Sequence, residues 1–177
     1  RVDRRQRQMC IRDRRWLDLL EVFTDVNPTV IASNGAVTYD LRNHRVISDT
    51  PFPIDVITDV VNDIASELPE AKFSLEEAQR CCVEPGFDRV DHGRPVTHQG
   101  PIHEFLTPDS RPVKMLVRAF DIPTEELFEI VDGVVDGRVS TTFSVQLDDG
   151  LVELAPIGVS KGAVSYTHLT LPTIYSV

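Results

Sequence analysis

Residues 29–40, with the sequence TVIASNGAVTYD, decide the fold of this chain. Thr29–Ala32 is a short apolar run of the length that a buried parallel strand has. Ser33, Asn34 and Gly35 follow it and form a turn signal. Two short strand patterns come next, over residues 36–39 and 45–48, and predict a hairpin. The segment therefore predicts a strand, a tight turn and a hairpin of an α/β protein.

Two helices are predicted on either side of this segment, because apolar residues recur there on one helical face. The apolar stripe of the first helix consists of Trp16, Leu19, Leu20 and Phe23. The second helix starts after Pro51 and Pro53 and runs to about residue 68. Its apolar stripe consists of Ile54, Ile57, Val61, Ile64 and Leu68. Asp55, Asp59 and Asp63 are expected on the exposed face.

The middle of the chain has a mixed pattern. Residues 73–83 are predicted as strand, although Ser74 and Glu77 also have the spacing of a helical capping box. Residues 84–112 are polar and rich in Pro and Gly, which indicates a long connection with one short helix near residues 102–106. In residues 113–119, apolar side chains alternate with Lys114 and Arg118, as in a half-buried strand.

A third helix and a second hairpin are predicted towards the end of the chain. Asp121 or Thr124 is expected to cap the helix, and Gly137 to end it. Its apolar stripe consists of Leu127, Ile130, Val131, Val134 and Val135. Residues 139–147 have the most regular two-residue alternation of the chain, and the turn at residues 148–150 connects them to a strand over residues 151–154.

The charge of the chain excludes some partners. The formal net charge is −10, and residues 1–14 contain six arginines and two aspartates, so the rest of the chain carries −14. Such a surface repels phosphate backbones and anionic lipids, so we expect neither a nucleic-acid partner nor a membrane partner. No apolar run approaches the ~20 residues of a membrane helix. Cys81 and Cys82 are adjacent, which fits a reducing compartment, and the expected location is the cytoplasm.

The two ends of the chain match translations of one DNA sequence, read on opposite strands. That DNA resembles a transposase adapter used in sequencing libraries; one strand encodes residues 4–14 and its reverse complement encodes residues 164–173. Composition alone would make residues 1–14 a basic arm for nucleic acid or a membrane surface. We expect instead that residues 1–14 and 163–177 are adapter-derived and disordered, and that the natural sequence is a fragment spanning about residues 15–162.

A second motif, VELAPIGVSKG at residues 152–162, completes a resemblance to a known family. Residues 29–40 resemble the strand and Asn-Gly-Ala turn that leave the core of Cof-type phosphatases of the haloacid dehalogenase superfamily, and residues 152–162 resemble the segment that re-enters it. The resemblance implies an α/β fold with a partial Rossmann-like core and a large inserted α/β cap domain. It assigns residues 15–40 to the core and hinge, 41–150 to the cap, and 151–162 to a return strand.

The resemblance also implies roles for individual residues. Lys161 matches the family's catalytic lysine, which balances the charge of an aspartate nucleophile and of the substrate phosphate. Asn34 and Gly35 would lie at the hinge beside the substrate-binding cleft, and Arg94 is the expected phosphate or sugar contact from a cap loop. Without the resemblance, Lys161 would be a solvated lysine at a helix start, and Asn34 and Gly35 would form only a turn.

The function implied is that of a magnesium-dependent phosphatase acting on small phosphorylated metabolites such as sugar phosphates. Nothing in this sequence matches the family's Asp-x-Asp-Gly-Thr nucleophile loop or its acidic magnesium ligands, so the chain alone is expected to be inactive and no metal ligand is assigned. His92, His98 and His103 do not have the spacing of a zinc site. The alternative is a noncatalytic α/β binding or interaction module that shares only the turn and the lysine.

Overall fold

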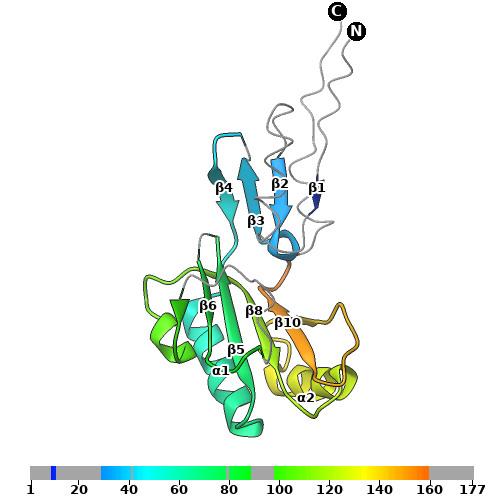
Figure 1. Cartoon of the computed structure of the whole chain (residues 1–177). Helices are drawn as coiled ribbons and strands as arrows, with labels where there is room; N and C mark the ends of the chain where they lie inside the picture. Colours follow the sequence, from blue (N-terminus) through cyan, green and yellow to red (C-terminus); the bar gives the residue numbers. More distant parts are fainter. Residues whose placement is uncertain (1–8, 11–28, 41, 79, 89–97, 160–177) are drawn as a thin grey trace, which may run out of the picture.

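The computed structural model describes residues 9–10, 29–40, 42–78, 80–88 and 98–159 of the chain. These residues form one sheet of four strands and one of six. Figure 1 shows the four-stranded sheet above the six-stranded sheet, with helices α1 (Ile54–Glu67) and α2 (Thr124–Val135) beside the larger sheet. Within the described residues, no helix is long and apolar enough to cross a bilayer.

The four-stranded sheet contains the segment that decides the fold. Its strands, in spatial order, are β1 (Met9–Cys10), β2 (Thr29–Ala32), β3 (Val37–Asp40) and β4 (Arg45–Asp49). The β3–β4 pairing is antiparallel, which confirms the predicted hairpin. Residues 30–32 of β2 are buried, as expected of a core strand. β2 is antiparallel to β3 and parallel to β1.

Strand β1 differs from the expectation that residues 1–14 have no structure. Met9 and Cys10 pair with Val30 and Ile31. A physical reason is available, because the edge of a strand presents unpaired backbone groups that accept a neighbouring strand whatever its side chains. The remaining residues of 1–14, the helix predicted at residues 16–23 and residues 163–177 lie outside the described part of the chain.

The six-stranded sheet combines segments that are far apart in the sequence. Its spatial order is β7-β6-β5-β8-β10-β9. The strands are β5 (Lys72–Glu77), β6 (Cys81–Val83), β7 (His98–Gln99), β8 (Pro112–Arg118), β9 (Ser140–Thr142) and β10 (Leu151–Ala155). The prediction of strand for residues 73–83 was therefore correct, and the alternative of a helix that begins at a capping box was wrong. The predicted short helix is also present, as η4 (Ile102–Phe105).

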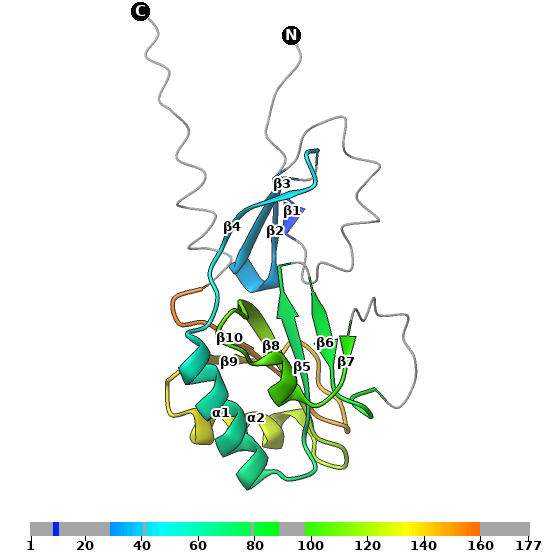
Figure 2. The same ribbon diagram turned by 90° about the vertical axis from the view of Figure 1, so that its left-hand side faces the viewer.

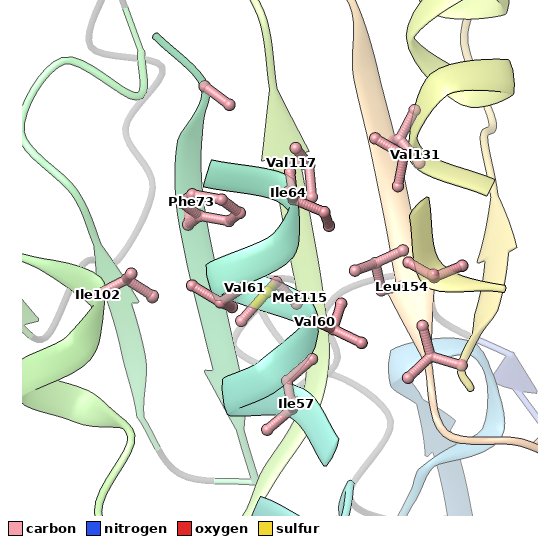
Figure 3. Close-up of a cluster of buried hydrophobic side chains, with 14 of the residues drawn as sticks. Ile57, Val60, Val61, Ile64, Phe73, Ile102, Met115, Val117, Val131 and Leu154 are labelled. Carbon is pink, nitrogen blue, oxygen red and sulfur yellow. The ribbon is translucent and has the colours of Figure 1, made fainter. Parts of the chain in front are cut away.

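One face of this sheet carries the main core. Figure 2 shows α1 and α2 on the same side of the sheet. Figure 3 shows Ile57, Val60, Val61 and Ile64 of α1 pointing towards side chains of β5, β8 and β10. Each of these four α1 side chains is fully buried, at 0% exposure. The predicted stripe of α1 is confirmed and gains Val60, while Asp55, Asp59 and Asp63 are exposed as predicted.

Strand β8 corrects one expectation, since it is buried along its whole length instead of on one face. Its apolar residues Met115 and Val117 pack in the helix-side core. Lys114 and Arg118 point to the opposite face but are only 2% and 9% exposed. The alternating pattern predicted the direction of these side chains correctly. It could not show that other segments cover them, because those contacts are distant in the sequence.

The predicted strand over residues 139–147 is mostly wrong. Only Ser140–Thr142 pairs with β10, and Phe143, Val145 and Leu147 are large apolar side chains left exposed. The predicted cap of α2 is also wrong, because the N-cap position is Pro123 and no side chain caps the helix. Thr124 instead binds the chain around Leu147 and Leu151.

The sheet pairings extend across the two segment boundaries predicted from the sequence, near residues 40 and 151. β4 lies beyond residue 40 but belongs to the four-stranded sheet, because the hairpin keeps it paired with β3. β10 was predicted as a return strand outside the cap, yet it pairs with β8 and β9 within the six-stranded sheet. The chain therefore passes from the four-stranded sheet to the six-stranded sheet after β4.

Candidate functional site

The turn after β2 faces the six-stranded sheet and has an unusual backbone. Figure 1 shows this turn at the end of the four-stranded sheet nearest to β8 and β10. Ser33, Asn34 and Gly35 form a single 3-10 turn, η3, and all three have positive φ values of 48°, 58° and 108°. Left-handed conformations cost energy for residues other than glycine and cluster at functional sites. We call Ser33–Gly35 the hinge turn.

Glu153 of β10 connects the hinge turn to the larger sheet. Its Oε2 accepts a hydrogen bond of 2.8 Å from Nδ2 of Asn34 and lies 3.4 Å from Nζ of Lys114. Its Oε1 accepts a hydrogen bond of 2.9 Å from Oγ of Ser144. Three separate parts of the chain therefore meet at one carboxylate, and the Asn34 contact spans 119 residues.

The surroundings of Glu153 favour its charged form. Burial on its own raises the pKa of the Glu153 carboxyl, but Lys114 and the hydrogen bonds from Asn34 and Ser144 oppose this effect and lower the pKa overall. The side chain of Lys114, which carries the partner ammonium, is only 3% exposed. Buried opposite charges in contact stabilise one another's ionised state. The hinge turn therefore contacts a fixed negative charge that has its own buried cation.

A row of polar side chains continues across the same face of the sheet. Lys114, Arg118 and Glu153 alternate along their strands with residues of the helix-side core, so they point away from the helices. Glu76 of β5 is on this face too, and its Oε2 accepts a 3.2 Å hydrogen bond from Ser33. We call Glu76, Lys114, Arg118 and Glu153 the polar face.

Arg118 lies at the far end of the polar face, beside two aromatic rings. Its guanidinium carbon lies 5.2 Å from the ring centre of Phe87 and 5.9 Å from that of Phe120. One of its terminal nitrogens lies 3.6 Å from Oδ1 of Asp88. Stacking on aromatic rings fixes a planar guanidinium while leaving its edge suited to carboxylate or phosphate groups.

The structure places two of the four predicted site residues. Asn34 and Gly35 lie in the hinge turn beside the polar face. Arg94 and Lys161 lie outside the described residues, so their positions remain predictions. Sequence analysis missed Glu153 and assigned Lys114 only to an exposed strand face. The available signal was a lysine or acid at alternate positions of otherwise apolar strands, at residues 114 and 153.

The polar face does not have the composition of a metal site. Among the described residues, no group of three or more His, Cys, Asp or Glu side chains is arranged to hold a metal ion. Both oxygens of Glu153 already accept contacts from protein donors. Magnesium prefers several oxygen ligands in octahedral geometry. The residues of the polar face therefore do not fit a magnesium ion.

Comparison with known families identifies the chain. The family model for haloacid dehalogenase-like hydrolases matches residues 13–170. The chain belongs to this family. No curated protein sequence matched the chain.

Several solved structures have the same α/β fold. A haloacid dehalogenase-like hydrolase from Bacteroides thetaiotaomicron has a TM-score of 0.70 at 11% identity, over 92% of this chain and 63% of its own. A protein from Thermotoga maritima has a TM-score of 0.70 at 19% identity, over 91% and 60%. A subclass IIB sugar phosphatase of the superfamily has a TM-score of 0.64 at 13% identity, over 88% and 58%.

These likenesses confirm the predicted fold class and define the extent of the chain. At such low identities the comparison concerns the fold and no finer property. The chain spans about three-fifths of the length of these three structures. The family membership of the chain supports its assignment to the hydrolases.

Proposed function

We propose that this chain is part of a magnesium-dependent phosphatase that acts on small phosphorylated metabolites such as sugar phosphates. The observation that carries the proposal is the junction of the hinge turn with the polar face, in a chain of the haloacid dehalogenase-like family. Two nearly buried cations, Lys114 and Arg118, lie on that face, each beside an acidic side chain, Glu153 and Asp88 respectively.

Lys161 is the proposed catalytic residue. A carboxylate that attacks a phosphoryl group brings several negative charges together, and a fixed ammonium offsets them in the transition state. Lys161 occupies the matching position of the family motif in residues 152–162. Arg94 is the proposed contact to the phosphate or sugar, and Asn34 and Gly35 are proposed to border the substrate. The proposed cap is the unit predicted at residues 41–150, less β4, which pairs in the four-stranded sheet, and with β10 added, which pairs in the six-stranded sheet.

The sugar-phosphate class rests on a structural neighbour. One solved structure of this fold is described as a sugar phosphatase. The polar face supports a hydrophilic substrate, because hydroxyl groups of a sugar pair with carboxylates such as Glu76 and with the cations beside it. The proposed magnesium would supply charge neutralisation, and its ligands are proposed to come from parts of the protein other than the polar face.

The test is activity of the whole gene product that contains this chain. The protein should hydrolyse sugar phosphates in the presence of Mg²⁺, with turnover followed by released phosphate. Lys161→Ala should reduce kcat by about 10² to 10³, since one fixed donor at a developing charge has this effect. Lys161→Arg should restore only part of the rate, because a planar guanidinium does not replace a compact ammonium.

Lys72 provides the matched control. It is a half-buried lysine of β5 outside both motifs, so Lys72→Ala should leave kcat nearly unchanged. A Lys161→Ala variant that keeps more than about half of the wild-type rate would return Lys161 to the role of a solvated surface lysine. Absence of any phosphatase activity from the folded whole protein would favour a noncatalytic binding module.

A further inference from the structure

We infer that Asn34, Glu153 and Lys114 form a clasp that fixes the orientation of the hinge turn, and with it the four-stranded sheet, against the six-stranded sheet. The inference concerns the joint between the two sheets and holds whether or not the proposed function is correct. It starts from one hydrogen bond, from Nδ2 of Asn34 to Oε2 of Glu153, at 2.8 Å. Oε2 also lies 3.4 Å from Nζ of Lys114.

The groups of the clasp are held in fixed positions. The Lys114 side chain is 3% exposed and that of Glu153 is 12% exposed, so neither group is surrounded by water. Hydrogen bonds to charged groups are stronger than neutral ones, and a poorly hydrated site strengthens them further. Ser144 holds the second oxygen of Glu153 at 2.9 Å, which fixes the plane of the carboxylate. Asn34 therefore meets an acceptor that cannot easily turn away.

The other polar contacts at the joint are longer or more exposed to water. Ser33 donates to Glu76 over 3.2 Å, which is long for a hydroxyl donor. Asp49 of β4 accepts two hydrogen bonds from Arg111, at 3.1 and 2.6 Å, but the Arg111 side chain is 60% exposed. Exposed ion pairs contribute little to stability because water screens them. Among the described contacts, Glu153 has the best-shielded link between the sheets.

The apolar contact between the two sheets at the joint is small. A cluster of short side chains connects the sheets, namely Ala32, Ala36, Val37 and Val113. Burial free energy scales with apolar area, so alanines and valines hold a joint less firmly than the large residues of the main core. A directional polar contact therefore decides the angle at which the sheets meet. Asn34 suits this role because asparagine tolerates its left-handed backbone, with φ of 58°.

Exchanging the two groups of the clasp tests the inference. Asn34→Asp places a second carboxylate against Glu153 and should open the joint by repulsion. Glu153→Gln in the same chain lets the new amide donate to the new carboxylate at position 34, which then also supplies the negative charge opposite Lys114. The double variant Asn34→Asp with Glu153→Gln should therefore recover the wild-type orientation, as a double-mutant cycle measures.

The measurement is the distance distribution between two nitroxide spin labels, one on each sheet unit. Exposed Ile47 of β4 and exposed Glu129 of α2 are replaced by cysteine for labelling, in the full chain. Cys10 and Cys81 are replaced by serine. Cys82 can stay, because it is 1% exposed and burial raises the pKa of its thiol to about 11, so it is not labelled.

The expected result is a single narrow distance in the wild type and a second, displaced population in Asn34→Asp. The ratio of the original to the displaced population should fall by about tenfold, the factor that one charge-assisted hydrogen bond carries. Asn43→Asp is the matched control. Nδ2 of Asn43 donates a 2.8 Å hydrogen bond to Asp40 within one hairpin, so the same chemistry is changed without a link between the sheets.

Two results would overturn the clasp. One is an unchanged distance distribution in Asn34→Asp, and the other is a double variant that stays displaced although its circular dichroism shows a folded chain. If Asn34→Asp does not fold, Asn34→Gly removes the donor without adding charge and tolerates the left-handed backbone, with φ of 58°. A folded Asn34→Gly chain with the wild-type distance distribution would equally refute the inference.

Discussion

At the scale of single residues, Gly150 is a position that has no room for a side chain. A Cβ at this position would lie 2.7 Å from the carbonyl oxygen of Ile122 and 2.9 Å from Cδ2 of Leu127. The backbone N–H of Gly150 also donates a 2.7 Å hydrogen bond to that oxygen, so the two segments cannot separate without losing it. The close approach between the start of α2 and the start of β10 therefore depends on glycine at position 150.

Gly150→Ala should lower the free energy of unfolding by about 1 to 3 kcal/mol, the usual cost of overpacking. Gly133 is the control, because it lies inside α2 and a Cβ added there would meet no neighbouring atom within 4 Å. Gly133→Ala should raise stability by about 0.5 to 1 kcal/mol through helix propensity. Urea denaturation of the two variants should give opposite signs, and equal signs would contradict the packing argument.

Glu153 should make stability depend on pH. Its folded-state pKa is lowered from the ordinary value of 4.5, despite burial, by Lys114, Asn34 and Ser144. A group with a lowered folded pKa stabilises the fold above the unfolded pKa, and this contribution is lost as pH falls through the folded pKa. The difference in unfolding free energy between wild type and Glu153→Gln should be constant near pH 7 and shrink below about pH 4.5. A difference that grows on acidification would contradict this account.

At the scale of elements, periodicity predicted the segments whose partners are close in sequence. The stripes of α1 and α2 were predicted almost residue by residue, because helix faces follow from a fixed period. Residues 143–147 have an equally regular alternation yet form no strand. A strand needs a partner edge, and β10 pairs only with Ser140–Thr142 on that side. Alternation shows which face a strand would bury and cannot show whether a partner extends far enough.

Thr124 shows how a side chain can hold two elements together. Its Oγ1 accepts hydrogen bonds from the N–H groups of Leu147 and Leu151, at 3.1 and 3.3 Å, and can donate to the carbonyl of Leu147. Thr124, whose side chain makes these hydrogen bonds, is 1% exposed. The start of α2 is thereby attached to the segment that leads into β10.

Thr124→Val should destabilise the protein by about 1 to 3 kcal/mol, because it keeps the shape and removes the acceptor of two backbone N–H groups. Thr124→Ser, which keeps the hydroxyl, should cost less than half as much. Thermal or urea unfolding of the two variants measures the difference. A loss in Thr124→Val that is no larger than the loss in Thr124→Ser would contradict the role assigned to the hydroxyl.

At the scale of the whole molecule, the candidate site consists of contacts that no local pattern contains. The hinge turn was predicted from Ser33, Asn34 and Gly35, since turn chemistry is local. Its partner Glu153 is 119 residues away and looks, in the sequence, like an ordinary polar position of a strand. The family resemblance brought the two segments together without naming the residues that touch. Tertiary contacts of single side chains depend on register and sheet order, which the sequence pattern leaves open.

The whole chain should fold without turning over a phosphomonoester. The two helices and the six-stranded sheet share one core of large, fully buried side chains, which is sufficient for a cooperative domain. The family's chemistry needs an aspartate nucleophile in an Asp-x-Asp-Gly-Thr loop, and no residues of this sequence match that loop. Without a nucleophile, the chain cannot form the covalent intermediate.

We therefore expect the purified chain to release phosphate from p-nitrophenyl phosphate at the rate of buffer alone, with or without Mg²⁺. A cooperative thermal transition in the same sample establishes that it is folded. Lys161→Ala distinguishes a contaminating phosphatase from the chain's own activity, because a contaminant is indifferent to this substitution. Metal-dependent turnover that follows the chain through gel filtration and falls in Lys161→Ala would mean that another carboxylate acts as the nucleophile, and the exposed acids of the chain would then be the residues to replace one by one.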